Sequence, residues 1–467
     1  MRPVCRRAPH RTASLAPAST GALLCVLGTL APLSCALASP LLMAGSALGA
    51  WGGPWDGLED GSGQDDDPGY KQGTLRGSIG FDRIGDDSFV LFSLRPELAI
   101  GRLGIGLGIP LRMNISTGEL REEDWDSTSD YLGIARYVRW AHKRAPLYIR
   151  LGALDNATLG HGSIVRHYSN ALDADERHTG LVLDLNRGSW GLESLFSNFA
   201  PPEVMGIRSY LRPFANQSSS PLGSLAFGAS LASDVSPNPF DDADADADAD
   251  AVTVYGFDVD LPIVRRSAFS LSLYYDFAQI VDFGHGHMVG AIHETRFPAN
   301  SLVLGSRLER RFMGDQFTTP YFGHFYEIER ATKRASLAEA EEPSGWFAEA
   351  SARVLGTFDI LGSYQWADED PNGWMHIETR LPNVVPGIRA RATYDRLLID
   401  EVSDIFSTDE DAHLRASFGY QLNPWLWMVG EFHRTWELES EDPVQPIYVS
   451  TDRYSVRLEL DIPLSGD

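Results

Sequence analysis

An alternation of apolar and polar side chains, repeated along most of the chain, limits the possible folds more than any other feature. It is clearest near the end of the sequence, where Tyr454, Val456, Leu458, Leu460 and Ile462 alternate with Ser455, Arg457, Glu459 and Asp461. The same period of two recurs at residues 252–261, 267–277, 374–381 and 412–421. Successive side chains of a β-strand point to opposite faces of the sheet. The sequence therefore predicts an all-β protein in which each strand has one apolar and one polar face.

Segment length separates two kinds of all-β protein, because strands of a soluble sandwich also alternate. Most alternating segments have roughly eight to thirteen residues, whereas soluble strands usually have about five or six. A strand that crosses a membrane needs roughly 9–11 residues. The lengths favour a transmembrane antiparallel up-and-down β-barrel.

The connections between these segments alternate between short and long. The short ones are Gly101–Arg102, His142–Ala145, Arg187–Gly188, Arg265–Arg266, Pro298–Asn300, Gly356–Thr357, Pro382–Pro386 and Asn423–Pro424. The long ones are 115–129, 155–177, 234–251, 314–344, 400–411 and 437–451. Bacterial barrels have short periplasmic turns and long outer loops. The pattern predicts about 20 strands, within a range of 16 to 20, with the first and last strands both ending on the periplasmic side.

Aromatic side chains recur near the ends of the expected strands. The tryptophans at such positions are Trp140, Trp190, Trp346, Trp366, Trp374, Trp425, Trp427 and Trp436. Amphipathic rings favour the level at which lipid meets the headgroups, so girdles of Trp and Tyr border membrane-spanning segments. Their recurrence supports the membrane barrel over the sandwich.

The first 38 residues have the features of a secretory signal peptide. A basic stretch at 1–20 is followed by an uncharged apolar stretch at 21–33, and Ala36-Leu37-Ala38 gives the small-x-small pattern of a cleavage site. A second such pattern is Ala47-Leu48-Gly49. The alternatives are a retained anchor helix, which Pro32 and Pro40 would interrupt, and a lipoprotein anchored at Cys35.

Three regions follow from these boundaries. We expect a signal peptide at 1–38, a flexible leader rich in Gly and acidic residues at 39–72, and the barrel at 73–467. All three cysteines lie in the first region, so the barrel has neither disulfides nor a thiolate metal site. The chain carries 64 acidic against 39 basic residues, a net charge of −25. This balance argues against a nucleic-acid partner, which needs a basic face.

In these features the chain resembles Gram-negative outer-membrane β-barrel proteins of porin-like size. The stretch Leu151–Asn170 also resembles a segment of uncharacterised outer-membrane proteins. The resemblance implies location in the bacterial outer membrane. It also implies contact with outer-membrane lipid and lipopolysaccharide, and assembly by the barrel-assembly machinery. Many such barrels end in an aromatic residue, whereas this chain ends Leu464-Ser465-Gly466-Asp467.

In each strand the alternate positions that carry charged residues must face inward. An Arg or Lys that faces lipid at mid-membrane destabilises the barrel by about 2–4 kcal/mol. Candidate lumen-facing residues are Arg307, Arg311, Arg353, Arg380, Arg389, Arg391, Arg415, Glu349, Glu378 and Glu431. One interpretation is a basic strip that attracts anions. The other is a ladder of ion pairs, such as Arg353 with Glu349 or Arg457 with Glu459, that fills the wall. The longest loop, 314–344, could fold into the lumen, and its tract Ser336–Glu342 is composed of helix-forming residues.

The sequence contains no hydrolase elbow, Walker loop, zinc-protease or dinucleotide motif. We therefore predict no catalytic residue, no cofactor and no metal site. The pair His285 and His287 lacks an evident third ligand, and the neighbours His161 and Ser163 do not by themselves make a catalytic pair.

Three functions remain open. The leading one is a passive or mildly selective channel for small polar solutes. The second is a non-conducting surface or structural barrel whose acidic loops bind cations or a partner. Such loops are centred on Asp404, Glu439, Glu369 and the Asp-Ala tract 241–250. The third is a barrel-borne hydrolase that uses His161.

Overall fold

A computed structural model describes residues 73–464 except positions 144, 155, 173–177, 200–202, 217–220, 238–250, 339, 341–343, 369–372, 382–384, 400–402, 407–410 and 441–446. The predicted signal peptide and leader lie outside the described residues. So do the Asp-Ala tract and most of the acidic residues around Asp404.

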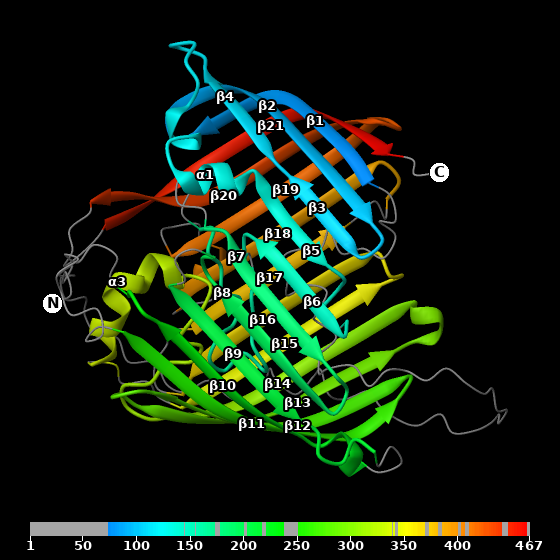
Figure 1. The fold of residues 1–467 in the computed structure, drawn as a ribbon, viewed down its shortest axis with the longest axis vertical. Coiled ribbons are helices and arrows are strands. Elements are labelled where there is room, and N and C mark those ends of the chain that lie inside the picture. Colours follow the sequence, from blue (N-terminus) through cyan, green and yellow to red (C-terminus); the bar gives the residue numbers. More distant parts are fainter. Residues whose placement is uncertain are drawn as a thin grey trace, which may run out of the picture. The chain divides into compact units, whose positions relative to one another are not determined.

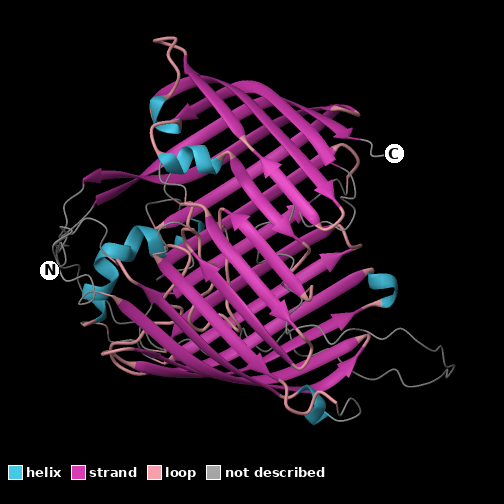
Figure 2. Ribbon diagram, viewed as in Figure 1, coloured by secondary structure: helices cyan, strands magenta, loops and turns pink. Residues whose placement is uncertain are grey.

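The described residues are mostly β-strand (Figures 1 and 2). The strands are β1 (Gly73–Ile84), β2 (Asp87–Ile100), β3 (Leu103–Leu107), β4 (Ile109–Asn114), β5 (Ala135–Trp140), β6 (Leu147–Gly152), β7 (Gly180–Asn186), β8 (Trp190–Phe196), β9 (Val204–Leu211), β10 (Ala226–Asp234), β11 (Val252–Arg266), β12 (Phe269–Ile280), β13 (His285–Arg296), β14 (Leu302–Met313), β15 (Gly345–Val354), β16 (Phe358–Ala367), β17 (Gly373–Leu381), β18 (Ile388–Ile399), β19 (Ala412–Asn423), β20 (Leu426–Ser440) and β21 (Ile447–Leu464). The helices are α1 (Thr128–Gly133), α3 (Tyr326–Leu337) and the 3₁₀ turns η1 (Glu122–Asp124), η2 (Pro221–Ser224), η3 (Pro298–Asn300) and η4 (Asp404–Phe406). Among the described residues, no helix is long and apolar enough to cross a membrane.

Antiparallel pairing of neighbours in sequence organises the whole sheet. β3 and β4 both pair with β2, one after the other, so they act as one crossing strand interrupted at Gly108. β1 pairs with β21 from Gly73↔Leu464 to Ile84↔Arg453, which closes the sheet on itself. The described residues thus form a closed antiparallel barrel of 20 crossing strands, as the sequence predicts.

The burial of the two strand faces is the reverse of that in a soluble protein. On β21 the exposed residues include Val456 (59%), Leu458 (44%) and Leu460 (42%), and the residues between them, Arg457 and Glu459, are buried. Other exposed apolar side chains include Ile79, Phe81, Phe92, Leu94, Phe257, Leu308 and Phe418. A large apolar outer surface is stable only when another apolar phase covers it. Lipid is therefore the solvent for the outer face of the barrel.

The connections follow the predicted order with some differences. The barrel begins and ends at the same end, since Gly73 pairs with Leu464. The predicted loop 437–451 is shorter than expected, because β20 and β21 extend through most of it. At the long-loop end, the connections at 85–86 and 281–284 are short, whereas β9 and β10 at the other end are joined through 212–225.

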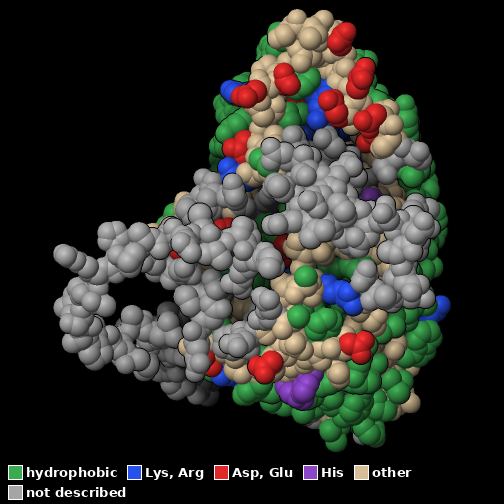
Figure 3. Space-filling view, turned by 90° about the vertical axis from the view of Figure 1, so that its left-hand side faces the viewer, with side chains coloured by type: hydrophobic (Ala, Val, Ile, Leu, Met, Phe, Trp, Pro, Cys, Tyr) green, Lys and Arg blue, Asp and Glu red, His purple; other side chains and the backbone are tan. Residues whose placement is uncertain are grey.

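The long-loop end faces the viewer in Figure 3. Hydrophobic side chains gather along the flanks of the barrel, and acidic side chains gather at the top of this view. The exposed acids of the β4–β5 connection include Glu119, Glu122 and Glu123.

Candidate functional site: the barrel lumen

Two long connections fold into the barrel and pack against each other. We call residues 156–172, between β6 and β7, the first lumen loop, and residues 314–338, between β14 and β15, the second lumen loop. The backbone N–H of Phe322 donates to Ile164 O (3.1 Å), and the N–H of Arg166 donates to Phe322 O (3.1 Å). The inward folding predicted for segment 314–344 is confirmed. Helix α3 (Tyr326–Leu337) includes the first two residues of the tract Ser336–Glu342, whose composition favours a helix, and positions 339, 341 and 342 of that tract lie outside the described residues.

The second lumen loop reaches opposite sides of the barrel. Tyr326 Oη donates to Asp234 Oδ2 on β10 (2.7 Å), whereas His324 Nε2 lies 3.0 Å from His413 Nδ1 on β19. β10 and β19 are nine positions apart in the ring of strands. A segment that contacts both β10 and β19 must cross the lumen. The second lumen loop therefore narrows the passage through the barrel.

An apolar cluster holds both loops against one sector of the wall. Its members from the two lumen loops are Leu159, Ile164, Val165, Tyr168, Phe317, Tyr321, Phe322, Tyr326 and Leu337, and Leu154 lies just before the first of them. Its wall members are Leu195, Val204, Ala232, Val252, Val254, Ala278, Ile280 and Met288. The wall members belong to strands β8 to β13, at positions that face inward. This sector therefore resembles the core of a soluble protein enclosed by the barrel.

An ion pair between Arg330 of α3 and Asp234 fixes the second lumen loop at this sector. Arg330 Nε and Nη2 donate to Asp234 Oδ2 and Oδ1 at 2.6 and 2.8 Å. The Arg330 side chain is 5% exposed and that of Asp234 is fully buried. Bidentate pairs of this kind combine strength with a fixed orientation. We call this pair the latch.

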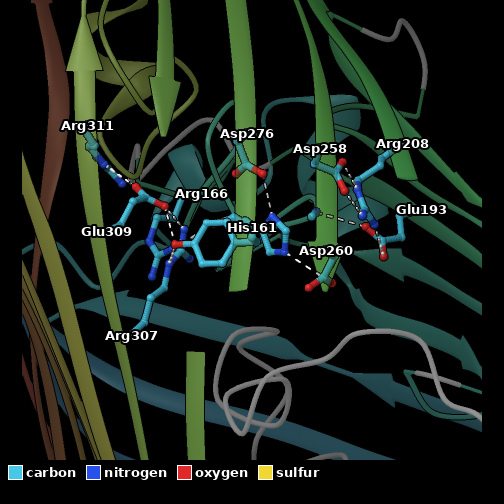
Figure 4. Close-up of polar contacts among 12 residues, drawn as sticks. His161, Arg166, Glu193, Arg208, Asp258, Asp260, Asp276, Arg307, Glu309 and Arg311 are labelled. Atoms are coloured by element: carbon cyan, nitrogen blue, oxygen red, sulfur yellow. Dashed lines mark hydrogen bonds and ion pairs between the residues drawn. The ribbon is translucent and has the colours of Figure 1, made fainter. Parts of the chain in front are cut away.

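His161 of the first lumen loop lies between two carboxylates (Figure 4). Its Nδ1 is 2.7 Å from Asp276 Oδ1, and its Nε2 is 3.7 Å from Asp260 Oδ2. Burial alone would lower the pKa of His161, but the charges of Asp276 and Asp260 outweigh burial and raise the pKa to about 10. The ring is thus a cation at neutral pH and fastens the first lumen loop to β11 and β12.

Two groups of paired charges lie on either side of His161, one on strands β8 to β11 and the other on β14 (Figure 4). Arg208 donates to Asp258 through Nε (2.9 Å) and Nη2 (2.7 Å), and to Glu193 through Nη1 (3.2 Å). Arg307 and Arg311 both donate to Glu309, at 2.6 and 2.5 Å. Pairing satisfies charges that would be costly to bury alone.

Tyr274 belongs to the group formed by Arg307, Glu309 and Arg311. Its hydroxyl donates to Glu309 Oε2 (2.5 Å) and accepts from Arg307 Nε (2.6 Å). Its ring lies on Gly290 of the adjacent strand, where an added Cβ would come within 2.2 Å of Cζ. A glycine on β13 thus makes room for the aromatic ring.

The ten lumen candidates from the sequence are distributed over several ion pairs. Arg307 and Arg311 share Glu309, and Glu349 pairs with Arg166 of the first lumen loop. Glu378 lies 3.4 Å from both Arg380 and Arg391. Arg389 pairs with Glu459, and Glu431 with Arg457 and Arg415. Arg457 also lies 3.5 Å from Glu459, as expected, but Arg353 pairs with Asp359 rather than with the expected Glu349.

The arginines of several pairs outside the loop-filled sector are more exposed than their partners. Side-chain exposure is 51% for Arg415, 41% for Arg353 and 34% for Arg391. The partner acids of Arg353 and Arg391, Asp359 and Glu378, are 9% and 2% exposed. At these positions the guanidinium group is therefore more accessible to solvent in the lumen than the carboxylate is.

A histidine cluster lies where the second lumen loop meets the opposite wall. His324, Asp395 of β18 and His413 of β19 each offer one ligand atom, and these atoms all lie within 4.8 Å of one another. Burial, with the neighbouring His413 and His376, lowers the pKa of His324 to about 4 despite the opposing effect of Asp395, so this ring is neutral at pH 7.

Several residues of the lumen clusters could not be predicted from the sequence. His324, Asp395 and His413 are far apart in the sequence and form no motif, and Arg166 and Arg208 gave no signal beyond their charge. The His285–His287 pair is placed on the outer face of β13, where Tyr275 Oη lies 2.7 Å from His287 Nδ1. His161 contacts carboxylates, and the described contacts of Ser163 include its carbonyl, which accepts from Thr319 Oγ1 (2.7 Å).

No protein-family model matches this chain, and no curated protein does. Among solved structures, OpdK of Pseudomonas aeruginosa, determined with vanillate, is 12% identical over 84% of this chain and 98% of that one, with a TM-score of 0.32. OccK2 of P. aeruginosa, determined with glucuronate, is 11% identical over 84% and 98%, with a TM-score of 0.30. CdiB of Acinetobacter baumannii is 9% identical over 83% of this chain, which spans only 60% of CdiB, with a TM-score of 0.26. Likenesses this weak carry no argument about function.

Three features of this chain itself define its architecture. These are the closed ring of antiparallel strands, the apolar outer face and the charged inner face. Together they are the architecture of a membrane-spanning antiparallel β-barrel.

Proposed function

We propose that this protein is a channel of the bacterial outer membrane that passes small polar solutes and prefers anions. The observation that carries the proposal is the exposure of Arg353, Arg391 and Arg415 to the lumen beside acids that are more deeply buried. Rings of cationic side chains favour anions in pores.

The size of the preference can be estimated from Coulomb's law. At roughly 7–10 Å in water, each unit charge contributes about 0.4–0.6 kcal/mol to the energy of a passing ion. This corresponds to about a two- to threefold change in the local concentration of a monovalent anion per charge. Buried partner acids cancel part of this effect, so we expect a modest preference.

The two lumen loops support a channel that is narrow rather than wide open. The second lumen loop crosses from β10 to β19, and the apolar cluster fills the sector of β8 to β13. The remaining passage runs along the charged wall that includes β15, β17, β18 and β19. Solutes small enough to pass the loops would meet the exposed arginines on this route.

Planar-bilayer recording of the purified protein tests the proposal. We expect discrete conductance steps, and in a KCl gradient a reversal potential that indicates anion preference. The triple variant R353Q/R391Q/R415Q should lose most of this preference. R310Q is the matched control, because Arg310 lies on the opposite phase of β14 and pairs with Asp368, away from the lumen.

Two results would overturn the proposal. Absence of conductance across many insertions of folded barrel would favour the non-conducting surface barrel. Cation preference in the unmodified protein, or an equal loss of anion preference in R310Q, would contradict the assigned role of the three lumen arginines.

A further inference from the structure

Three histidines contact one buried carboxylate at the side of the lumen opposite the latch, and two more histidines pack against these three. His324 comes from the second lumen loop and His167 from the first, while the wall supplies His376 on β17, His413 on β19 and His433 on β20. The Asp395 carboxylate is 6% exposed, and His376 Nδ1 lies 2.7 Å from its Oδ1. The other oxygen, Oδ2, is buried and accepts no hydrogen bond from the described residues.

Three ligand atoms face one another at distances suited to a metal ion. His324 Nε2 is 3.0 Å from His413 Nδ1, and these atoms are 3.4 and 3.6 Å from Asp395 Oδ2. Zinc binds His nitrogen and carboxylate oxygen at about 2.0–2.2 Å in tetrahedral geometry. Such bond lengths place neighbouring ligand atoms roughly 3.3–3.5 Å apart. The observed edges of the triangle bracket this range.

Each of the three groups has an outer partner that can orient it for a metal. His324 Nδ1 lies 3.1 Å from the carbonyl oxygen of His167, which can only accept, so a proton on Nδ1 leaves Nε2 as the nitrogen that can bind a metal. His413 Nε2 lies 3.4 Å from His433 Nε2. His376 holds Asp395 by Oδ1 and leaves Oδ2 directed at the two rings. Metal-binding histidines and carboxylates are held in this way by outer partners.

We propose that His324, Asp395 and His413 bind a divalent first-row transition metal of the Zn²⁺ type. Two imidazoles and one carboxylate suit such ions better than Ca²⁺ or Mg²⁺, which prefer oxygen ligands. The bound ion would place a positive charge between Asp395 Oδ2 and the two imidazole nitrogens that face it. This site departs from the sequence-based prediction of no metal, because its ligands converge only in the folded barrel.

The ion would have a structural consequence. His324 lies on the second lumen loop, one residue before Phe325 and the start of α3, whereas Asp395 and His413 lie on the wall. Metal binding would therefore fasten the loop to β18 and β19, while the latch fastens it to β10. The inference does not depend on whether the barrel conducts.

Zinc titration of the purified, chelator-treated, folded barrel tests the site. We expect one Zn²⁺ per chain by calorimetry with ZnCl₂, and visible d–d absorption when Co²⁺ replaces it. H324Q, which changes no wall residue, and D395N should each weaken binding at least about 100-fold, and H376Q about 10–100-fold through its outer position. The matched control is H285Q/H287Q, which removes two histidines from the outer face.

A second readout tests the fastening of the loop. Zn²⁺ should slow tryptic cleavage at Lys333 and Arg334 in the unmodified protein and leave the rate in H324Q unchanged. Heat-dependent gel mobility verifies that every variant is folded. Lack of stoichiometric binding, equal affinity in H324Q and D395N, or loss of binding in H285Q/H287Q would overturn the metal site. Binding without slower cleavage would overturn the fastening.

Discussion

The latch between Arg330 and Asp234 allows a direct test of how the second lumen loop is held. The variant R330M keeps most of the aliphatic stem and removes the guanidinium. Among the described residues, the fully buried Asp234 would then keep two donors, the hydroxyl of Tyr326 (2.7 Å) and the backbone N–H of Ser236 (2.9 Å). We expect the loop to leave the lumen more often.

The expected size follows from the burial of the pair. Removing one partner of a buried ion pair costs about 3–5 kcal/mol, because the other charge is left uncompensated. The two hydrogen bonds that Asp234 retains place the expected cost near the lower value, about 3 kcal/mol. Since about 1.4 kcal/mol corresponds to a factor of ten, the ratio of released to docked loop should rise by roughly two orders of magnitude.

Limited proteolysis and bilayer recording measure this change. Trypsin should cleave at Lys333 and Arg334 about 100-fold faster in R330M if cleavage follows the released population. The single-channel current should show larger or more frequent open events. K333M is the matched control on the same helix, because Lys333 pairs with the partly exposed Glu329 four residues earlier (2.8 Å), an interaction worth about 0.3–0.5 kcal/mol. Since K333M removes the tryptic site at Lys333, the two variants are compared by cleavage at Arg334 alone.

The reasoning would be refuted if R330M, shown to be folded, resisted trypsin as well as the unmodified protein and conducted in the same way. Equal effects of R330M and K333M would also contradict it, because only one of the two cations has a buried partner.

Two further predictions concern pH and lipid. The pKa of His161 is raised from 6.5 to about 10, so its contribution to docking of the first lumen loop is fully present below about pH 6.5 and is lost as the pH rises through about 10. Proteolysis within residues 156–172 should therefore accelerate between pH 7 and pH 10.5, and in H161N the rate, corrected for protease activity, should not depend on pH. On the outer face, V456R should destabilise the barrel by about 2–4 kcal/mol in urea-induced unfolding from vesicles. S417R, on the inward phase of β19, should cost much less, and equal costs would contradict the assignment of the two faces.

The barrel could be predicted from the sequence because lipid imposes a simple condition on each strand. Every second residue of a segment such as Tyr454–Ile462 must be apolar, so the period of two survives without knowledge of the partners. The alternation of short and long connections then gave the up-and-down order. Strand ends were less certain, as the extension of β20 and β21 into the expected loop shows.

The contents of the lumen could not be predicted in the same way. Val252 and Val254 share the inward phase with Asp258 and Asp260, yet they pack against the lumen loops. An apolar residue on the charged phase is thus a signal of an inserted loop, but it does not identify which loop. The convergence of His324, Asp395 and His413 depends on the path of a loop across the lumen, which strand periodicity does not specify.

The pairing of β1 with β21 makes closure of the barrel depend on its first and last strands together. Every other pairing joins strands that are near neighbours along the chain, whereas the seam joins Gly73 to Leu464 and continues for 12 pairs. Until the last strand arrives, two long rows of backbone groups remain unsatisfied, and hydrocarbon would penalise each by several kcal/mol. A chain that lacks β21 would therefore keep open edges on β1 and β20, and its barrel would not close.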